Sequence, residues 1–251
     1  SFNVVACPKN ITQAKVAAEV VKGFQVSDLD NSNTAIILAD EALLFPMLHN
    51  LPSEIKKLNV TMGSPLKNTA LFSLVEAIFK LQIHAIKYNR NAFYYKDIIA
   101  VIEHPYFSKI TKISDGIAFM NFIKKSNIVF VTQRNIDTYF MSSNAIKLVF
   151  QLWSSVDDSL QTLNKLIEEL KLPLVDKKGS IESEILATFY NAFTVLKNLI
   201  EENNFEIELK TLQIIMQQLV AKESIPFKGE PLKGVQLMGI LESRTLDFKN
   251  V

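Results

Sequence analysis

The chain has 251 residues and carries 27 Lys and Arg against 26 Asp and Glu, which gives a formal net charge of +1. This balance shows neither a global basic excess for nucleic-acid binding nor an acidic excess typical of disorder. Nearly half of the residues are hydrophobic, so the chain can bury a full core, and we expect two lobes. The single cysteine, Cys7, excludes an internal disulfide and fits a reducing compartment.

The sequence lacks the features of a membrane or secreted protein. It has no run of about 20 apolar residues and no basic-then-apolar leader. We therefore predict a cytoplasmic protein with no membrane partner. The chain starts at Ser1 without Met and stops where a strand begins at Asn250, so we expect an excised piece with an exposed or frayed sheet edge.

The first 63 residues alternate between strand and helix patterns. FNVVAC at residues 2–7 predicts a first strand, with Cys7 as a buried inert thiol, and a helix pattern then runs to Phe24. TAIILA at 34–39 is continuously apolar, as expected of a parallel strand covered on both faces, and LNVTMG at 58–63 predicts a third strand. This alternation is typical of a parallel α/β sheet.

From Leu66 onward, apolar residues recur at helical spacing. VFVTQ at 129–133 could be a short strand or a packed loop, and strand character returns only in VQLMGI, from Val235. The closing strand needs neighbours, and the other strands lie at the front of the chain. We therefore predict an α/β domain formed by residues 1–65 and 227–251, with a large all-helical domain, residues 66–226, inserted into it.

The charge on the predicted insertion is unevenly distributed. Residues 80–134 hold nine Lys or Arg against three acids, an excess of six, whereas residues 157–208 hold eleven acids and five bases. Both regions could be ordinary solvated faces. Alternatively, the basic region faces phosphates, and its aromatic residues stack on bases. The aromatic candidates are Tyr94, Tyr95, Tyr106 and Phe107.

Common catalytic motifs are missing from the sequence. It contains no P-loop, dinucleotide-binding, metalloprotease or nucleophile-elbow pattern. His49, His84 and His104 have no carboxylate or second His at helical spacing, so we interpret them as structural or surface residues. We predict no catalytic residue and no metal ligand.

The last seventeen residues resemble a helicase motif. VQLMGILESRTLDFKNV is similar to VQLMTLHSAKGLEFPQV, a typical motif V of UvrD-like superfamily 1 helicases and of AddB-type subunits of helicase–nucleases. The coinciding residues are Val235, Gln236, Leu237, Met238, Leu246, Phe248 and Val251. TAIILADEALLFPMLHNLP and LNVTMG also resemble the second RecA-like domain of this family, which a largely helical domain interrupts before motif V. The resemblance implies a RecA-like parallel sheet built from both termini.

The departures from motif V imply a lost activity. Gly239, Leu241 and Thr245 stand where the family has Thr, His and Gly, which removes groups that contact the DNA backbone. Asp247 alone remains for the Glu that reaches the nucleotide. The resemblance therefore implies an inactivated AddB- or RecC-like helicase domain, fused or bound to a PD-(D/E)XK nuclease that processes double-strand breaks.

The resemblance also suggests site residues and partners. The nucleotide-binding candidate is Asp247; the DNA-binding candidates are Arg244, Thr245, Glu242 and Lys249 around the turn, with Lys9 and Asn10 after the first strand. Each could equally be an ordinary surface residue. The expected partners are DNA, single-stranded or as duplex ends, and a nuclease or helicase subunit. We expect no enzyme activity or cofactor for this chain alone, with ATP and Mg²⁺ reserved for a parent helicase–exonuclease.

Two alternatives remain open. The helical domain could be a protein-interaction module that docks a nuclease or motor subunit without touching DNA. The chain could also belong to an active motor whose nucleotide-binding motifs lie upstream of Ser1.

Overall fold

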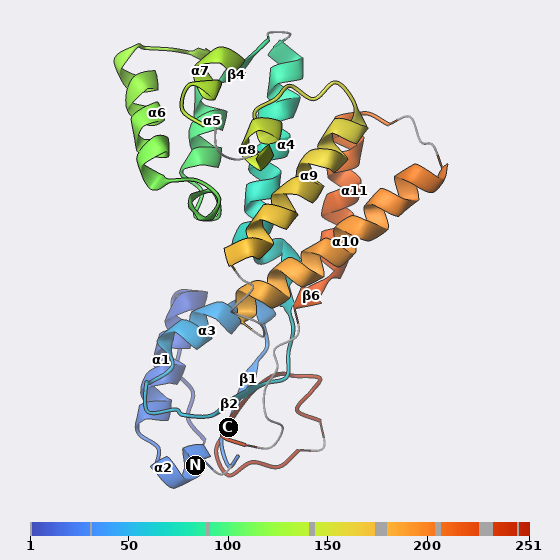
Figure 1. Ribbon diagram of the computed structural model, residues 1–251. Coiled ribbons are helices and arrows are strands. Elements are labelled where there is room, and N and C mark those ends of the chain that lie inside the picture. Colours follow the sequence, from blue (N-terminus) through green and yellow to red (C-terminus); the bar gives the residue numbers. More distant parts are fainter. Residues whose placement is uncertain are drawn as a thin grey trace. The chain divides into compact units, whose positions relative to one another are not determined.

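The computed structural model describes residues 2–30, 32–88, 91–140, 144–173, 180–203, 207–225, 233–244 and 246–251. In this part of the chain the architecture is α/β, with many helices and a small parallel sheet (Figure 1). The chain divides into two compact units. The first comprises Ser1–Ser64 and Ile225–Val251, and the second comprises Pro65–Ser224.

The first unit is a three-stranded parallel sheet with helices. Its elements are α1 (Asn10–Lys22), α2 (Val26–Asp30), β1 (Ala35–Leu38), η1 (Glu41–Leu43), α3 (Leu44–Asn50), β2 (Leu58–Val60) and β7 (Val235–Gly239). The strand order is β1-β7-β2. Ile37 pairs with Met238 and Val60 pairs with Leu237, both in parallel. The prediction that the strand near Val235 joins the front strands is thus confirmed.

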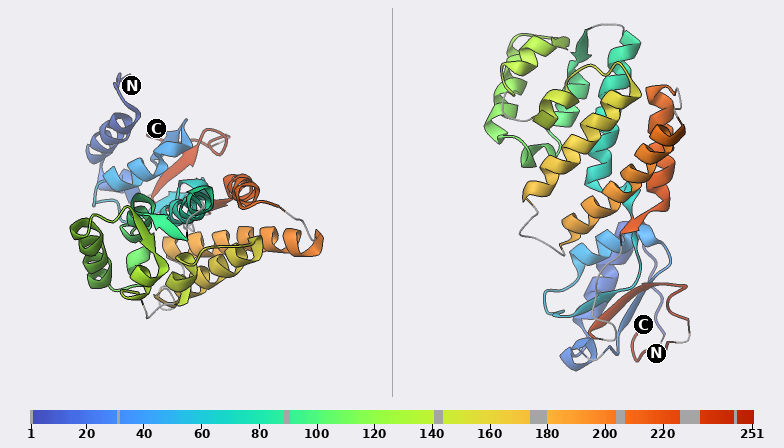
Figure 2. Two further views of the ribbon diagram at one scale, coloured as in Figure 1. Left: turned by 90° about the horizontal axis from the view of Figure 1, so that it is seen from above. Right: turned by 45° about the vertical axis from the view of Figure 1, so that its right-hand side comes forward.

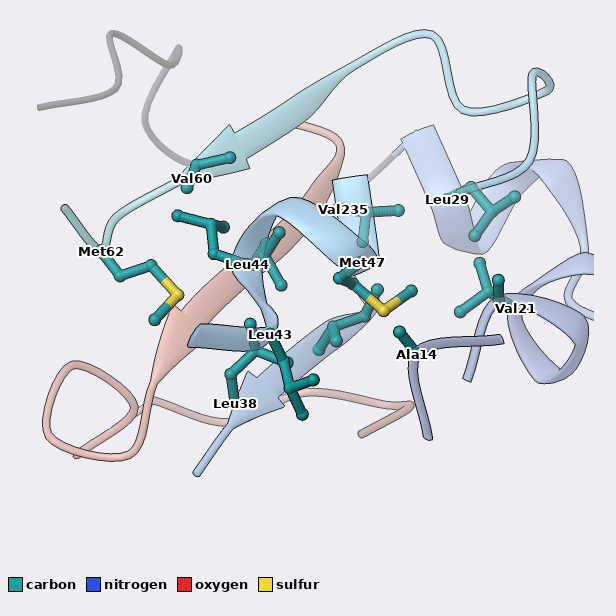
Figure 3. Close-up of a cluster of buried hydrophobic side chains, with 13 residues drawn as sticks. Ala14, Val21, Leu29, Leu38, Leu43, Leu44, Met47, Val60, Met62 and Val235 are labelled. Carbon is teal, nitrogen blue, oxygen red and sulfur yellow. The ribbon is translucent and has the colours of Figure 1, made fainter. Parts of the chain in front are cut away.

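The core of this unit explains why its strands are so apolar. All five residues of β7 are buried, because β1 and β2 flank the strand and side chains pack on its faces. Ala14, Ala18 and Val21 lie on one face of α1 and join Leu44 and Met47 of α3 in the same cluster as the strand residues (Figure 3). Spacings of three and four residues along α1 place these side chains on one side of the helix.

The predicted first strand is wrong. Residues 2–7 have no strand structure, and Phe2, Val4 and Val5 are 91%, 80% and 59% exposed. Cys7 is a free, half-buried thiol rather than a buried strand residue. The β preference of such residues comes mainly from packing on a neighbouring strand, and residues 2–7 pair with none of the strands β1, β7 and β2.

The far side of β1 is instead approached by the end of the chain. Asn250 forms an isolated parallel bridge with Thr34, and the amide of Ala35 donates to the Asn250 carbonyl at 2.9 Å. The residues after β7 therefore return to the start of β1.

The second unit is mainly helical. Its long helices are α4 (Ala70–Tyr88), α6 (Ile113–Lys125), α9 (Val156–Lys171), α10 (Ile181–Asn203) and α11 (Leu209–Lys222). Shorter ones are α5 (Tyr95–Ile102), α7 (Gln133–Asp137), α8 (Asn144–Val149), η2 (Leu66–Asn68) and η3 (Phe107–Lys109). Helix α10 packs against both α9 and α11 (Figure 2). The two-residue strands β3 (Ser64–Pro65) and β6 (Ser224–Ile225) lie where the chain enters and leaves this unit.

The expectation of an all-helical region is wrong in one detail. Strands β4 (Ala92–Tyr94) and β5 (Phe130–Thr132) pair antiparallel, with Phe93 opposite Val131. The segment at 129–133 is thus a short strand rather than a loop. Three-residue strands are too short to show an alternating pattern in sequence, and the partner segment was hidden between two helix patterns.

Local capping explains where α9 begins. The Ser155 hydroxyl accepts from the backbone amide of Asp158, and the Asp158 carboxylate accepts from the amide of Ser155.

In the described ranges, no helix is both long enough and apolar enough to cross a membrane.

Candidate functional site

The carboxyl ends of β1 and β7 define one edge of the parallel sheet. Leu38, the last residue of β1, pairs with Gly239, the last residue of β7. Asp40 follows β1, and its Oδ1 accepts from the amide of Ala42 at 3.0 Å, which fixes the start of η1. In open α/β sheets, ligands bind outside this edge, so we take it as the candidate site.

A pocket of about 400 Å³ lies at this edge beside β1. Its polar lining comes from Asn10 and Gln13 in the first turns of α1 and from Asp40, and its apolar lining includes Leu43 and Met47. The first turn of α1 receives no side-chain hydrogen bond from its N-cap residue, Lys9. Uncapped amides and the positive end of the helix dipole favour an anion there. Of the predicted residues, Lys9 and Asn10 therefore lie at this edge.

The turn after β7 starts at the same edge. The Ser243 hydroxyl donates to the carbonyl of Ile240 at 2.8 Å and closes the turn. The Glu242 side chain folds back over Gly239. A Cβ atom at position 239 would lie only 2.5 Å from the Glu242 Oε2. Glu242 and Arg244 are exposed on this turn. The edge thus combines two cationic residues, at positions 9 and 244, with the carboxylates of residues 40 and 242.

Lys249 lies at the opposite edge of the sheet. Its backbone amide donates to the carbonyl of Asn33, just before β1, at 2.9 Å. Its Nζ donates to both carboxylate oxygens of Asp28, at 2.9 and 3.0 Å. This hydrogen bond lowers the pKa of Asp28, outweighing the opposing effect of burial. The structure therefore separates Lys249 from the candidates at the carboxyl edge, because the chain runs back along the sheet after the turn.

Two predicted site residues remain, Asp247 and Thr245. Asp247 is exposed on the returning segment, between the turn and Lys249. Thr245 lies outside the described residues. Residues that are close to the turn in sequence therefore lie at both edges of the sheet in the structure.

In the basic region of the second unit, two of the four aromatic residues proposed to stack on bases are buried. Tyr106 and Phe107 are only 6% and 2% exposed, so their rings belong to the core and cannot stack on bases. Tyr94 and Tyr95 are half-buried, with ring centroids 5.0 Å apart. Two of the basic residues are engaged with acids: Lys109 binds Glu182, and Lys80 lies near Asp97. The sequence could not exclude Tyr106 and Phe107 from the stacking alternative, because core and surface aromatic residues have the same local sequence pattern.

His84 and Asp97 form a pair that the sequence did not predict. His84 Nδ1 lies 2.7 Å from Asp97 Oδ2, and Asp97 is 5% exposed. The carboxylate comes from α5 rather than from the helix of His84, so no i+3 or i+4 spacing could have indicated it. The buried carboxylate orients the imidazole ring, which lines an open pocket of about 320 Å³ with Glu76 and Lys80.

No model of a known protein family matches the sequence, and no curated protein matches it. Within the described ranges, no group of three or more His, Cys, Asp or Glu side chains is arranged to hold a metal ion.

Proposed function

We propose that this chain is part of a DNA-repair helicase–nuclease. In this proposal it is the inactivated second RecA-like domain of a UvrD-like superfamily 1 helicase, interrupted by a large helical insertion. It binds and guides DNA ends in the cytoplasm without hydrolysing ATP, and its partner is a nuclease or helicase subunit.

One observation carries the proposal. β7, whose residues resemble motif V, lies between β1 and β2 and is parallel to both. The compact helical unit Pro65–Ser224 comes between β2 and β7 in the chain. The helicase family returns to its sheet at motif V after a helical domain, so the order of elements supports the proposal. Gln236, which coincides with a Gln of motif V, has a structural role in the sheet: its Oε1 accepts from the buried Asn59 Nδ2 at 2.6 Å.

The charges at the carboxyl edge indicate how DNA would be held. Lys9, the first turn of α1 and Arg244 can contact phosphates, whereas Asp40 and Glu242 repel them. Two cationic side chains imply few phosphate contacts. Each neutralised phosphate changes the slope of log K against log salt by about −0.9 on a duplex, so we expect a slope of about −2.

Fluorescence anisotropy with a labelled single strand and a labelled duplex tests this proposal. Combining Lys9→Ala with Arg244→Ala should lower the affinity at low salt about tenfold or more and flatten the salt dependence. Lys22→Ala is the matched control, because Lys22 is exposed in the last turn of α1 and binds Glu19 on the same helix. Absence of binding at low salt, or an equal loss in the control variant, would refute the proposed DNA contact.

A second candidate function is protein docking by the helical unit. Val195 and Leu199 lie one turn apart on α10 and are 56% and 42% exposed. An apolar helix face of this kind can bind a nuclease or motor subunit. This function predicts that Val195→Glu with Leu199→Glu weakens complex formation with the proposed nuclease partner while leaving DNA anisotropy unchanged. A complex of unaltered affinity would exclude the face as the interface.

A further inference from the structure

The second unit contains an open pocket of about 480 Å³ at the end of α4 and the starts of α9 and α11. Its apolar lining includes Ile83, Ile86, Trp153, Val156 and Leu209. Ile86 is 55% exposed, so one apolar wall remains open to solvent. Pockets of this size and composition commonly hold small ligands or peptide side chains.

The pocket is held in shape by buried hydrogen bonds. The backbone amide of Trp153 donates to the Gln82 Oε1 at 3.1 Å, and its indole Nε1 donates to the Leu148 carbonyl at 3.2 Å. The indole also packs edge-on against Phe79, with ring centroids 5.7 Å apart. Because both N–H groups of Trp153 have acceptors and the residue is 5% exposed, this wall is preformed.

The rim of the pocket is positively charged. Lys87 from the last turn of α4 and Lys210 from the first turn of α11 both line it, against one acid, Glu208. Glu208 is the N-cap of the 14-residue helix α11, and its side chain makes no capping hydrogen bond. The start of α9 is different, because Ser155 and Asp158 close it with a capping box. A negative group is therefore favoured at the α11 side of the rim.

We propose that this pocket binds the C-terminal end of a partner peptide. The last side chain, an apolar one, occupies the floor beside Trp153, and the terminal carboxylate lies between Lys87 and Lys210 near the first amides of α11. A peptide C-terminus places one negative charge next to one apolar side chain, which matches the single net positive charge and the apolar floor. This mode of recognition needs only one carboxylate and is independent of the proposed DNA contact at the sheet edge.

Calorimetric titration of the whole chain with matched peptides tests the proposal. The probes are acetylated pentapeptides that end in Leu, Ile or Phe, each with a free carboxylate or with a carboxamide. Trp153 is the only tryptophan in the chain, so its fluorescence provides a second readout at the pocket itself. The free acids should bind at least about tenfold more tightly than the amides, as expected for charge-assisted hydrogen bonds.

Variants separate the two parts of the site. Lys87→Ala with Lys210→Ala should remove the preference for the free acid and leave amide binding unchanged, whereas Ile86→Asp should weaken both. Lys222→Ala at the far end of α11 is the control and should change neither. Equal affinity for acid and amide, or no binding of any of the six peptides, would overturn the proposal. DNA anisotropy of the same variants should be unaltered, so this test fails or succeeds independently of the DNA-binding test.

Discussion

Gly234 is the position where a single methyl group should disturb the sheet most. Its φ is +74°, in the left-handed region, and it immediately precedes β7. A Cβ atom there would lie 2.1 Å from the carbonyl oxygen of Lys57, the residue before β2. That carbonyl accepts the amide of Val235 at 3.1 Å, in the first bond between the two strands. We therefore expect Gly234→Ala to destabilise the first unit.

The magnitude follows from two contributions. Placing Ala in the left-handed region costs about 1–2 kcal/mol. Relieving the contact requires the backbone of residue 57 to move, which weakens its hydrogen bond with Val235 by about 1 kcal/mol. The sum is about 2–3 kcal/mol, a large part of the roughly 5–15 kcal/mol by which domains are stable. With a urea dependence of about 1.5 kcal/mol per molar, the unfolding midpoint should fall by about 1.3–2 M.

Two probes are needed because the chain has two compact units. Trp153 lies in the second unit, so its fluorescence follows that unit, whereas amide hydrogen exchange at β1 and β7 follows the sheet. Gly234→Ala should shift the exchange of the sheet far more than the fluorescence transition.

Gly23→Ala is the control, because it adds the same methyl group elsewhere in the first unit. Gly23 caps α1 with a φ of −76°, and its added Cβ would lie 3.3 Å from the Val20 carbonyl oxygen. This change should alter the free energy of unfolding by less than about 1 kcal/mol. Equal effects of the two substitutions, or an effect of Gly234→Ala below 1 kcal/mol, would refute the reasoning.

Three further predictions concern buried and titrating groups. Gln82→Met should destabilise the second unit by about 3–5 kcal/mol, because it leaves two backbone carbonyls and the Trp153 amide unpaired, and Trp153 emission should report unfolding at lower urea. Lys249→Met should lower the stability of the first unit near neutral pH. Since the hydrogen bond from Lys249 lowers the pKa of Asp28 below 3.8, this difference should shrink as the pH falls through that lowered pKa, as acid titration followed by circular dichroism can show. Burial and then Glu182 raise the pKa of Tyr106 from 10.0 to about 12, so stability should fall between these pH values; Tyr106→Phe should remove that fall and the matching phenolate absorbance.

Local patterns in the sequence were sufficient to identify several elements. The continuously apolar run at 34–39 contains β1, the strand-like run at 235–240 contains β7, and the helical spacing after Leu66 matches a series of amphipathic helices. These features depend on the order of neighbouring residues, because a buried strand or a helix face repeats over a few positions. The pairing of the two runs could also be expected, since a closing strand needs neighbours.

Other features depended on residues that meet from distant parts of the chain. Residues 2–7 have the composition of a strand but have no paired neighbour, and Lys249 lies at the opposite sheet edge from Glu242, seven residues earlier. The alternative in which Tyr106 and Phe107 stack on bases required exposed rings, and both rings are buried. His84 and Asp97 come from two different helices, and the 480 Å³ pocket is lined by residues from three. Sequence alone determined which segments could bury an apolar face, whereas only the tertiary structure decided what each face and each charge meets, because those contacts depend on chain return and packing rather than on adjacent residues.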